Sequence, residues 1–167
     1  YLVECCGSGM QELINELRKV IEYAGPGGTI TKESIDKLCI KQIQAIIFDL
    51  TDCLGAKNVG KALEILKKLE YNKEPVQKIL ITLYNHFKKL YIVKISNEYK
   101  TNLAESMNLK PNQMFLTRKY SEQARFFTKE ELRKIIDELI NLDAGYKQGL
   151  IDLDIGLDSI LCRYCSK

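Results

Sequence analysis

Apolar residues recur every three or four positions along nearly the whole chain, the spacing that places them on one face of an α-helix. No stretch alternates apolar and polar residues as a half-buried strand does, and the sequence has no Asn-Gly or Asp-Gly hairpin turn. The pattern therefore predicts an all-α fold, a multi-helix bundle. The longer apolar faces are Leu13, Ile14, Leu17, Val20 and Ile21; Ile43, Ile46, Ile47, Leu50 and Leu54; Val59, Leu63, Leu66 and Leu69; Ile79, Leu80, Leu83, Phe87, Leu90 and Tyr91; Leu132, Ile135, Ile136, Leu139 and Ile140; and Leu157, Ile160, Leu161 and Tyr164.

Capping residues and breakers delimit the first helices. A helix ending at Cys6 is expected to be closed by Gly7 in a left-handed conformation, and Ser8 with Gln11 has capping-box spacing for the next helix. That helix ends at the strong breaker Gly25-Pro26-Gly27-Gly28. Thr31 then caps a short helix that extends to Cys39.

The middle of the chain holds one ambiguous run, Tyr91-Ile92-Val93-Lys94-Ile95, whose composition also suits a strand. No turn residue separates it from the preceding helix, so a single helix is predicted from Pro75 toward Tyr99. Further helices are expected over 103–107 and about 112–126, the latter with inward apolar contacts, and Thr128 with Glu131 forms another capping box. The predicted inward side chains of 112–126 and its flank are Met114, Phe115, Tyr120 and Phe127.

Composition narrows the function classes only slightly. The hydrophobic fraction of 46% supports a folded core, and the net charge of +3 neither indicates nor excludes nucleic-acid binding. No apolar run is long enough to span a bilayer, and Tyr1-Leu2-Val3-Glu4 does not resemble a signal peptide. A start without Met suggests a piece of a longer protein.

Six cysteines raise the question of disulfides or metal binding. A chain of this size and apolar content does not need disulfide staples, so reduced thiols in a cytoplasmic protein are expected. Cys162-x-x-Cys165 has zinc-ligand spacing, and Cys5-Cys6 offers further thiols. With no second C-x-x-C and a single histidine, plain thiols and no metal are favoured.

The segment Gly55-Ala56-Lys57-Asn58-Val59-Gly60-Lys61-Ala62 matches the phosphate-loop pattern G-x-x-x-x-G-K except for the final Ser or Thr. That missing hydroxyl would bind magnesium, and the segment follows a predicted helix rather than a buried strand. A turn between two helices is therefore favoured over a nucleotide site, and no cofactor is expected.

Histidine and the basic pairs are the remaining candidates for chemistry. His86 stands near an apolar helical face, where packing or hydrogen bonding is the more common role, and no nucleophile with a partner base is apparent. No catalytic residue is therefore predicted. Basic residues with the aromatic Tyr120 among them suggest a possible contact with a DNA backbone, although a solvated helix face is the more common meaning. The candidate DNA-facing positions are Lys88, Lys89, Arg118, Lys119 and Arg125.

An ordered set of residues extends over nearly the whole chain and resembles the delta subunit of the bacterial replicative clamp loader, a relative of AAA+ ATPases. Each motif is mostly an apolar helix face, so the resemblance lies in the order and spacing; Cys53 stands where Ala is expected. The motifs are Gly7, Glu16 and Leu17; Gly27-Gly28-Thr29-Ile30-Thr31 and Ile35; Ile47-Phe48-Asp49-Leu50-Thr51-Asp52-Cys53-Leu54; Ala62-Leu63-x-Ile65-Leu66-x-x-Leu69; Glu74-Pro75; Ile79-Leu80-x-x-Leu83; Phe87-x-x-Leu90; Gln123-Ala124; Glu131-Leu132; Leu139; Asp143; and Lys147-x-Gly149.

The resemblance implies a partial AAA+ helical lid over residues 1–40 and a clamp-loader collar domain over residues 41–167. It implies a non-catalytic component of the DNA polymerase III holoenzyme, whose collar joins the ATPase (gamma/tau type) and delta-prime subunits. Contact with the sliding clamp is implied only through an N-terminal module outside this sequence, and contact with primed DNA only indirectly. A helical nucleic-acid-binding domain remains the alternative.

Overall fold

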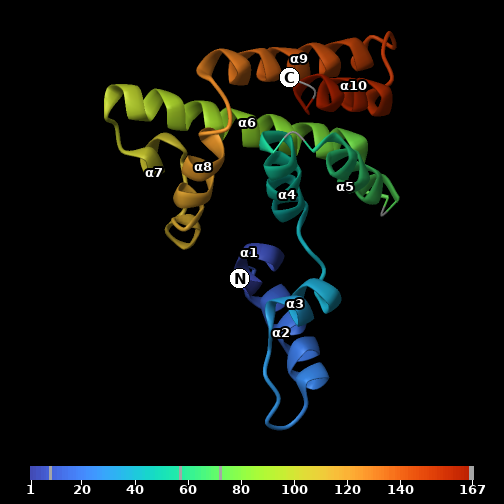
Figure 1. The fold of residues 1–167 in the computed structure, drawn as a ribbon, viewed down its shortest axis with the longest axis vertical. Helices are drawn as coiled ribbons and strands as arrows, with labels where there is room; N and C mark the ends of the chain where they lie inside the picture. The colour runs from blue at the N-terminus through green and yellow to red at the C-terminus, as the bar shows by residue number, and fades with distance from the viewer. Residues whose placement is uncertain (8, 57, 72, 166–167) are drawn as a thin grey trace. The chain divides into compact units, whose positions relative to one another are not determined.

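A computed structural model describes residues 1–7, 9–56, 58–71 and 73–165, apart from the side chains of Asn112 and Cys165. All regular structure in these residues is helical, so the predicted all-α fold is confirmed (Figure 1). The chain forms two compact units, Tyr1–Ile46 and Ile47–Lys167. The predicted division into lid and collar at residue 40 stays a prediction, because compactness alone does not identify either unit.

The first unit contains three helices and the start of a fourth: α1 (Leu2–Cys6), α2 (Met10–Ala24), α3 (Lys32–Leu38) and the first residues of α4 (Ile43–Gly55). Helix α2 packs against α1 and α3. The core of this unit is small and unusually rich in thiols. Its buried residues are Cys5, Cys6, Val20, Ile35 and Cys39.

The second unit is built around one long helix, α6 (Val76–Tyr99). Helices α9 (Lys129–Lys147) and α10 (Leu153–Cys165) lie along one side of α6, and α7 and α8 lie on another (Figure 1). Helix α5 packs against α10. The remaining bounds are α5 (Val59–Tyr71), α7 (Leu103–Ser106), the 3₁₀ turn η1 (Pro111–Gln113) and α8 (Leu116–Ala124).

Helix α6 supplies the centre of this core because several of its sides are covered at once. Its buried positions extend from the first turn to the last, at the three- and four-residue steps that the sequence shows. The ambiguous run Tyr91–Ile95 lies inside this helix, as predicted, and the helix ends at Lys100 in the left-handed region with φ 53°. The buried residues of α6 are Ile79, Leu80, Leu83, His86, Phe87, Leu90, Val93 and Ser96.

Two of the predicted caps are confirmed. The Thr31 hydroxyl accepts a hydrogen bond from Ser34 N, and the Thr128 hydroxyl accepts one from Glu131 N. Gly7 has the predicted positive φ of 81°, but its ψ of −176° lies outside the left-handed helical region. The predicted capping role of Ser8 lies outside the described residues.

The prediction of one helix over 112–126 is wrong. A 3₁₀ turn at Pro111–Gln113 precedes α8, which begins only at Leu116 and ends at Ala124. The change of helical pitch breaks the register between the start of this segment and Tyr120. As a result Tyr120 is fully buried while Met114 and Phe115 remain exposed, contrary to their predicted inward role.

The apolar stripe predicted for α2 is also only partly correct. Val20 is buried and Leu13 packs beside the thiol-rich core, but Ile14, Leu17 and Ile21 are 37%, 40% and 52% exposed. Helices α1 and α3 have five and seven residues and leave part of this stripe of α2 uncovered.

The central role of α6 predicts a large difference between two of its neighbouring residues. Leu83 is 1% exposed, whereas Ile81 on the same helix is 57% exposed. Leu83→Ala should lower the free energy of unfolding by about 2–5 kcal/mol, because it leaves a cavity in the core. Ile81→Ala should change it by less than about 1 kcal/mol. Urea denaturation of both variants checks this, and equal effects would contradict the central packing of α6.

Candidate functional site

The candidate site residues lie around a buried cluster where α4, α6 and α8 meet. Phe48 comes from α4, His86 from α6 and Tyr120 from α8. The Phe48 ring centroid lies 4.7 Å from that of His86 and 4.8 Å from that of Tyr120, and the Phe48 and His86 rings are edge to face. Gln123, one turn after Tyr120, is also buried. The cluster therefore joins three helices through ring contacts.

Gln123 completes the polar part of this cluster. Its Nε2 donates to the Phe48 carbonyl oxygen at 2.8 Å and to Asp52 Oδ1 at 2.7 Å. Its Oε1 lies 2.9 Å from His86 Nε2. Because both amide hydrogens of Gln123 are used, Oε1 accepts and His86 Nε2 carries the hydrogen. This bond fixes the histidine tautomer.

His86 is held neutral by its surroundings. The residue is completely buried, and the desolvation of its ring lowers its pKa to about 3, although the hydrogen bond that His86 donates to Gln123 acts in the opposite direction. A ring with no exposed surface does not exchange protons with a substrate in solution. The predicted packing and hydrogen-bonding role of His86 is confirmed.

Two of the predicted basic residues lie against this aromatic cluster. Lys89 Nζ is 5.3 Å from the Tyr120 ring centroid, and Lys119 Nζ is 5.3 Å from the Phe48 ring centroid. These distances are typical of cation–π contacts. Burial also lowers the pKa of Lys89. The structure thus brings Lys89 and Lys119 to neighbouring rings, which their separation in sequence does not reveal.

The other three predicted basic residues have different surroundings. Lys88 Nζ lies 5.9 Å from the Tyr84 ring centroid, and Arg118 Nε pairs with Glu122 Oε1 at 2.8 Å. Arg125 is exposed just after α8. The five positions therefore do not form one group of unpaired cations.

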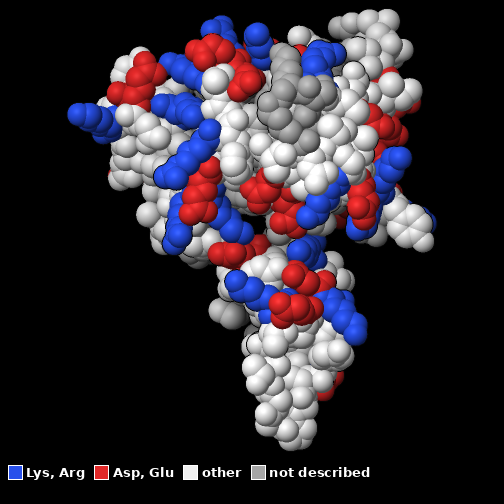
Figure 2. All heavy atoms as spheres, in the orientation of Figure 1, with Lys and Arg blue, Asp and Glu red and all other residues white. Residues whose placement is uncertain are grey.

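Acidic residues lie among these cations. A surface pocket of about 210 Å³ beside Lys119 is also lined by Asp49, Asp52 and Glu122. On the face of the second unit drawn in Figure 2, basic and acidic residues are interspersed rather than gathered into one basic field. Carboxylates at this position repel phosphates, so the local charge is poorly suited to binding a nucleic-acid backbone.

The near-match to a phosphate loop is a turn between helices. Gly55 is the last residue of α4 and Val59 the first of α5, and Asn58 Oδ1 accepts a hydrogen bond from Lys61 N at 3.1 Å. A Cβ on Gly55 would collide with the Phe126 ring, which explains a glycine there without any ligand. The predicted turn is confirmed in the described part of this segment; Lys57 lies outside it.

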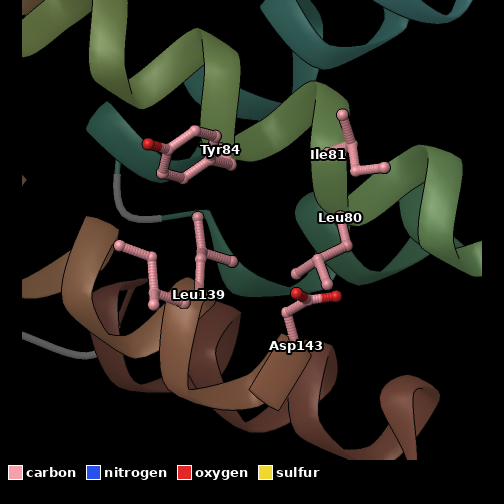
Figure 3. A pocket seen from close by; sticks show the side chains of 6 residues that line it. Leu80, Ile81, Tyr84, Leu139 and Asp143 are labelled. Atoms are coloured by element: carbon pink, nitrogen blue, oxygen red, sulfur yellow. The ribbon is translucent and has the colours of Figure 1, made fainter. Parts of the chain in front are cut away.

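A pocket that sequence reasoning missed lies between α6 and α9, with a volume of about 150 Å³ (Figure 3). Leu80, Ile81 and Tyr84 line it from α6, and Leu139, Ile140 and Asp143 line it from α9. Among these lining side chains, Tyr84 and Asp143 carry polar atoms, and the Asp143 carboxylate pairs with Lys147 at 2.6 Å.

The exposed isoleucines distinguish this pocket from ordinary core. Ile81 is 57% exposed and Ile140 is 48% exposed, although Ile140 belongs to the apolar face predicted from sequence. Ile81 directly follows a buried leucine and so lies off the main stripe of α6. In the sequence, the only sign of this additional apolar surface was Ile81, an apolar residue outside the main apolar face of α6.

The thiols are free wherever they are described: Cys5, Cys6, Cys39 and Cys53 are buried, and Cys162 is partly exposed. The prediction of plain thiols at Cys162-x-x-Cys165 stays a prediction, because the Cys165 side chain lies outside the described residues. Within the described chain, no helix combines the length and the apolar character that crossing a bilayer requires.

Comparison with known proteins gives a consistent result. Residues 44–164 match the family described as "DNA polymerase III delta subunit, C-terminal domain". The chain is 26% identical over 167 residues to DNA polymerase III subunit delta of Bacillus subtilis, covering 98% of this chain and 47% of the relative. It is 30% identical over 152 residues to the probable DNA polymerase III subunit delta of Aquifex aeolicus, covering 88% and 43%.

The solved structure of the Bacillus subtilis DNA clamp loader delta protein has the same fold. It aligns with a TM-score of 0.83 at 24% identity, over 99% of this chain and 49% of that protein. The chain therefore spans about half the length of the proteins that it matches.

The burial of His86 predicts a pH dependence of stability. Its pKa is about 3 in the folded protein and about 6.5 when unfolded, so the unfolded chain binds more protons between these values. The contribution of His86 is fully present above pH 6.5 and is lost as the pH falls toward 3. Lowering the pH from 7 to 5 should reduce the free energy of unfolding by roughly 2 kcal/mol through this residue.

Urea denaturation at both pH values measures this effect. His86→Gln keeps a side-chain donor near Gln123 but does not titrate, so its loss of stability between pH 7 and 5 should be smaller by that amount. An unchanged pH dependence in His86→Gln would show that His86 is not held neutral.

Proposed function

The chain belongs to the DNA polymerase III delta subunit family, and on that premise we propose that its second unit is an assembly module of a clamp loader. In this role α6 and α9 present a surface to neighbouring subunits, and the chain itself carries out no reaction. The partners are the ATPase subunits of gamma/tau type and the delta-prime subunit. A cytoplasmic location follows from this role.

The observation that carries the proposal is the apolar pocket between α6 and α9. Ile81 and Ile140 stand at its edge with about half of their surfaces exposed. Apolar side chains that are exposed together, with polar groups at the margin, are typical of protein–protein contacts. Both helices also contribute to the core, so the pocket lies on a rigid part of the unit.

Rigid support matters because a preorganised surface loses less conformational entropy on binding. Leu80 and Leu139 line the pocket but are otherwise buried, so the pocket floor is continuous with the core. Gln77 Nε2 donates to the Tyr146 hydroxyl at 2.9 Å, so a hydrogen bond joins α6 and α9 in addition to their apolar contacts.

Within the same proposal, residues 1–40 are a partial AAA+ lid and residues 41–167 the collar. Contact with the sliding clamp belongs to another part of the full-length subunit, and contact with primed DNA is indirect. The length of the relatives, about twice that of this chain, is consistent with such a division of roles.

Assembly is tested by mixing the chain with the ATPase and delta-prime subunits of its own clamp loader and measuring the mass by size-exclusion chromatography with light scattering. The expected result is a defined complex that contains all of the added subunits. The double variant Ile81→Asp/Ile140→Asp should weaken assembly by at least about tenfold, because it places charge in an apolar contact.

The matched control is Ile155→Asp, which adds the same charge at an isoleucine of α10 that is 71% exposed and does not line the pocket. It should assemble as the unmodified chain does. Equal loss in both variants, or assembly unaffected by the double variant, would place the contact elsewhere.

Direct contact with a DNA backbone is a second candidate, favoured by the position of Lys89 and Lys119 on neighbouring rings. In this proposal Lys88, Lys89, Arg118, Lys119 and Arg125 face DNA. The acidic residues beside Lys119 oppose it, and so does the pairing of Arg118 with Glu122.

The two exposed cations Lys88 and Arg125 allow a direct test. If they contact phosphates, Lys88→Ala/Arg125→Ala should weaken binding to a primed duplex and reduce the slope of log affinity against log salt by about 2. Arg18→Ala, at an exposed arginine of the first unit, should leave the slope unchanged. Fluorescence anisotropy over a salt series measures both, and identical slopes for all three proteins would exclude a phosphate contact through Lys88 and Arg125.

A further inference from the structure

Three groups able to bind a metal ion converge in the first unit. The Sγ atoms of Cys6 and Cys39 and a carboxylate oxygen of Glu16 all lie within 4.8 Å of one another. They come from three separate places in the chain: the end of α1, the middle of α2 and the residue that follows α3. Cys6 is 2% exposed and Cys39 is 9% exposed, while the Glu16 side chain retains 12% of its exposure.

The two thiols lie beside the Glu16 carboxylate. The Cys39 thiol donates to the backbone carbonyl oxygen of Glu16 at 3.9 Å. Burial, and then the neighbouring Cys39 thiol, raises the pKa of Cys6 to about 12.

We propose that Cys6, Glu16 and Cys39 form a binding site for Zn²⁺ that joins α1, α2 and the end of α3. Two sulfur atoms and one carboxylate oxygen are a donor set that Zn²⁺ accepts, and water occupies the fourth tetrahedral position. On binding, both thiols lose their protons to solvent and become thiolates, so two protons are released for each ion.

The composition of the first unit's core indicates what the ion contributes. Three of the five buried residues in its described core are cysteines. Several larger apolar side chains of α2 remain exposed, so little hydrophobic burial holds the short helices together. An ion bound by residues from α1, α2 and the end of α3 would link these short helices.

Glu16 has to exchange partners on binding. Its Oε2 accepts a hydrogen bond from Ile40 N at 3.1 Å and pairs with Lys19 Nζ at 2.5 Å. The Lys19 side chain is 42% exposed, and its Nζ also donates to the Leu38 carbonyl oxygen at 3.4 Å, so it retains a partner when Glu16 binds an ion. The Ile40 bond keeps the carboxylate oriented, as second-shell hydrogen bonds do for metal-binding carboxylates.

The test is a titration of the reduced 167-residue chain with Co²⁺, whose thiolate complexes absorb in the visible and near ultraviolet, followed by displacement with Zn²⁺. One ion per chain and release of two protons are expected. Hydrogen exchange should slow in α1, α2 and α3 on adding Zn²⁺ and stay unchanged in α9. Cys6→Ala and Cys39→Ala should each weaken binding by more than about tenfold.

Two further variants separate this site from others. Glu16→Gln keeps both thiols, so it should retain the thiolate absorption with weaker binding even if a cysteine variant fails to fold. Cys162→Ala and Cys53→Ala should bind as the unmodified chain does. Absence of binding by the unmodified chain, or loss of binding in Cys162→Ala with retention in Cys6→Ala and Cys39→Ala, would overturn the proposal.

Discussion

The second unit depends on the burial of one helix from several directions. Helix α6 packs against α9 and α10 and also against α7 and α8. A helix in this position needs apolar side chains over a wide arc rather than on a narrow stripe. Leu80, Leu83 and Val93 point in different directions around α6 and meet this need, and each is 2% exposed or less. The short helices are ordered through their contacts with α6 and with one another.

Burial from several directions also determines how polar groups are used. A charged or unpaired histidine in this core would lower the stability of the fold. The ring of His86 is instead neutral and hydrogen-bonded to Gln123. Gln123 in turn donates hydrogen bonds to the Phe48 carbonyl oxygen of α4 and to the Asp52 carboxylate. A fully bonded network of this kind fixes the rotation of α4 and α8 relative to α6, which apolar contacts alone do less specifically.

The two units solve the problem of stability differently. The second has long helices that cover one another, and its exposed isoleucines beside α6 and α9 are a surplus available for contact with other proteins. The first has short helices, a thiol-rich core and an α2 face that is only partly covered. The ion proposed for the first unit would link its short helices, and the exposed isoleucines of the second unit would contact other proteins.

Some features were determined by the sequence itself because they depend on neighbours within one or two turns. The all-α class, the caps at Thr31 and Thr128 and the continuation of α6 through Tyr91–Ile95 all follow from local spacing and turn residues. The order of apolar motifs was also sufficient to indicate the family. The break before α8 was missed because a 3₁₀ turn changes the register without an obvious breaker beyond Pro111.

Only the tertiary structure decided which distant residues meet. Lys89 and Lys119 lie on adjacent rings, Ile81 and Ile140 share a pocket, and Cys6 approaches Glu16 and Cys39. These groupings depend on the angles at which helices cross and on the paths of the turns between them. Helical periodicity specifies which face of a helix is apolar, but not which other face it will meet.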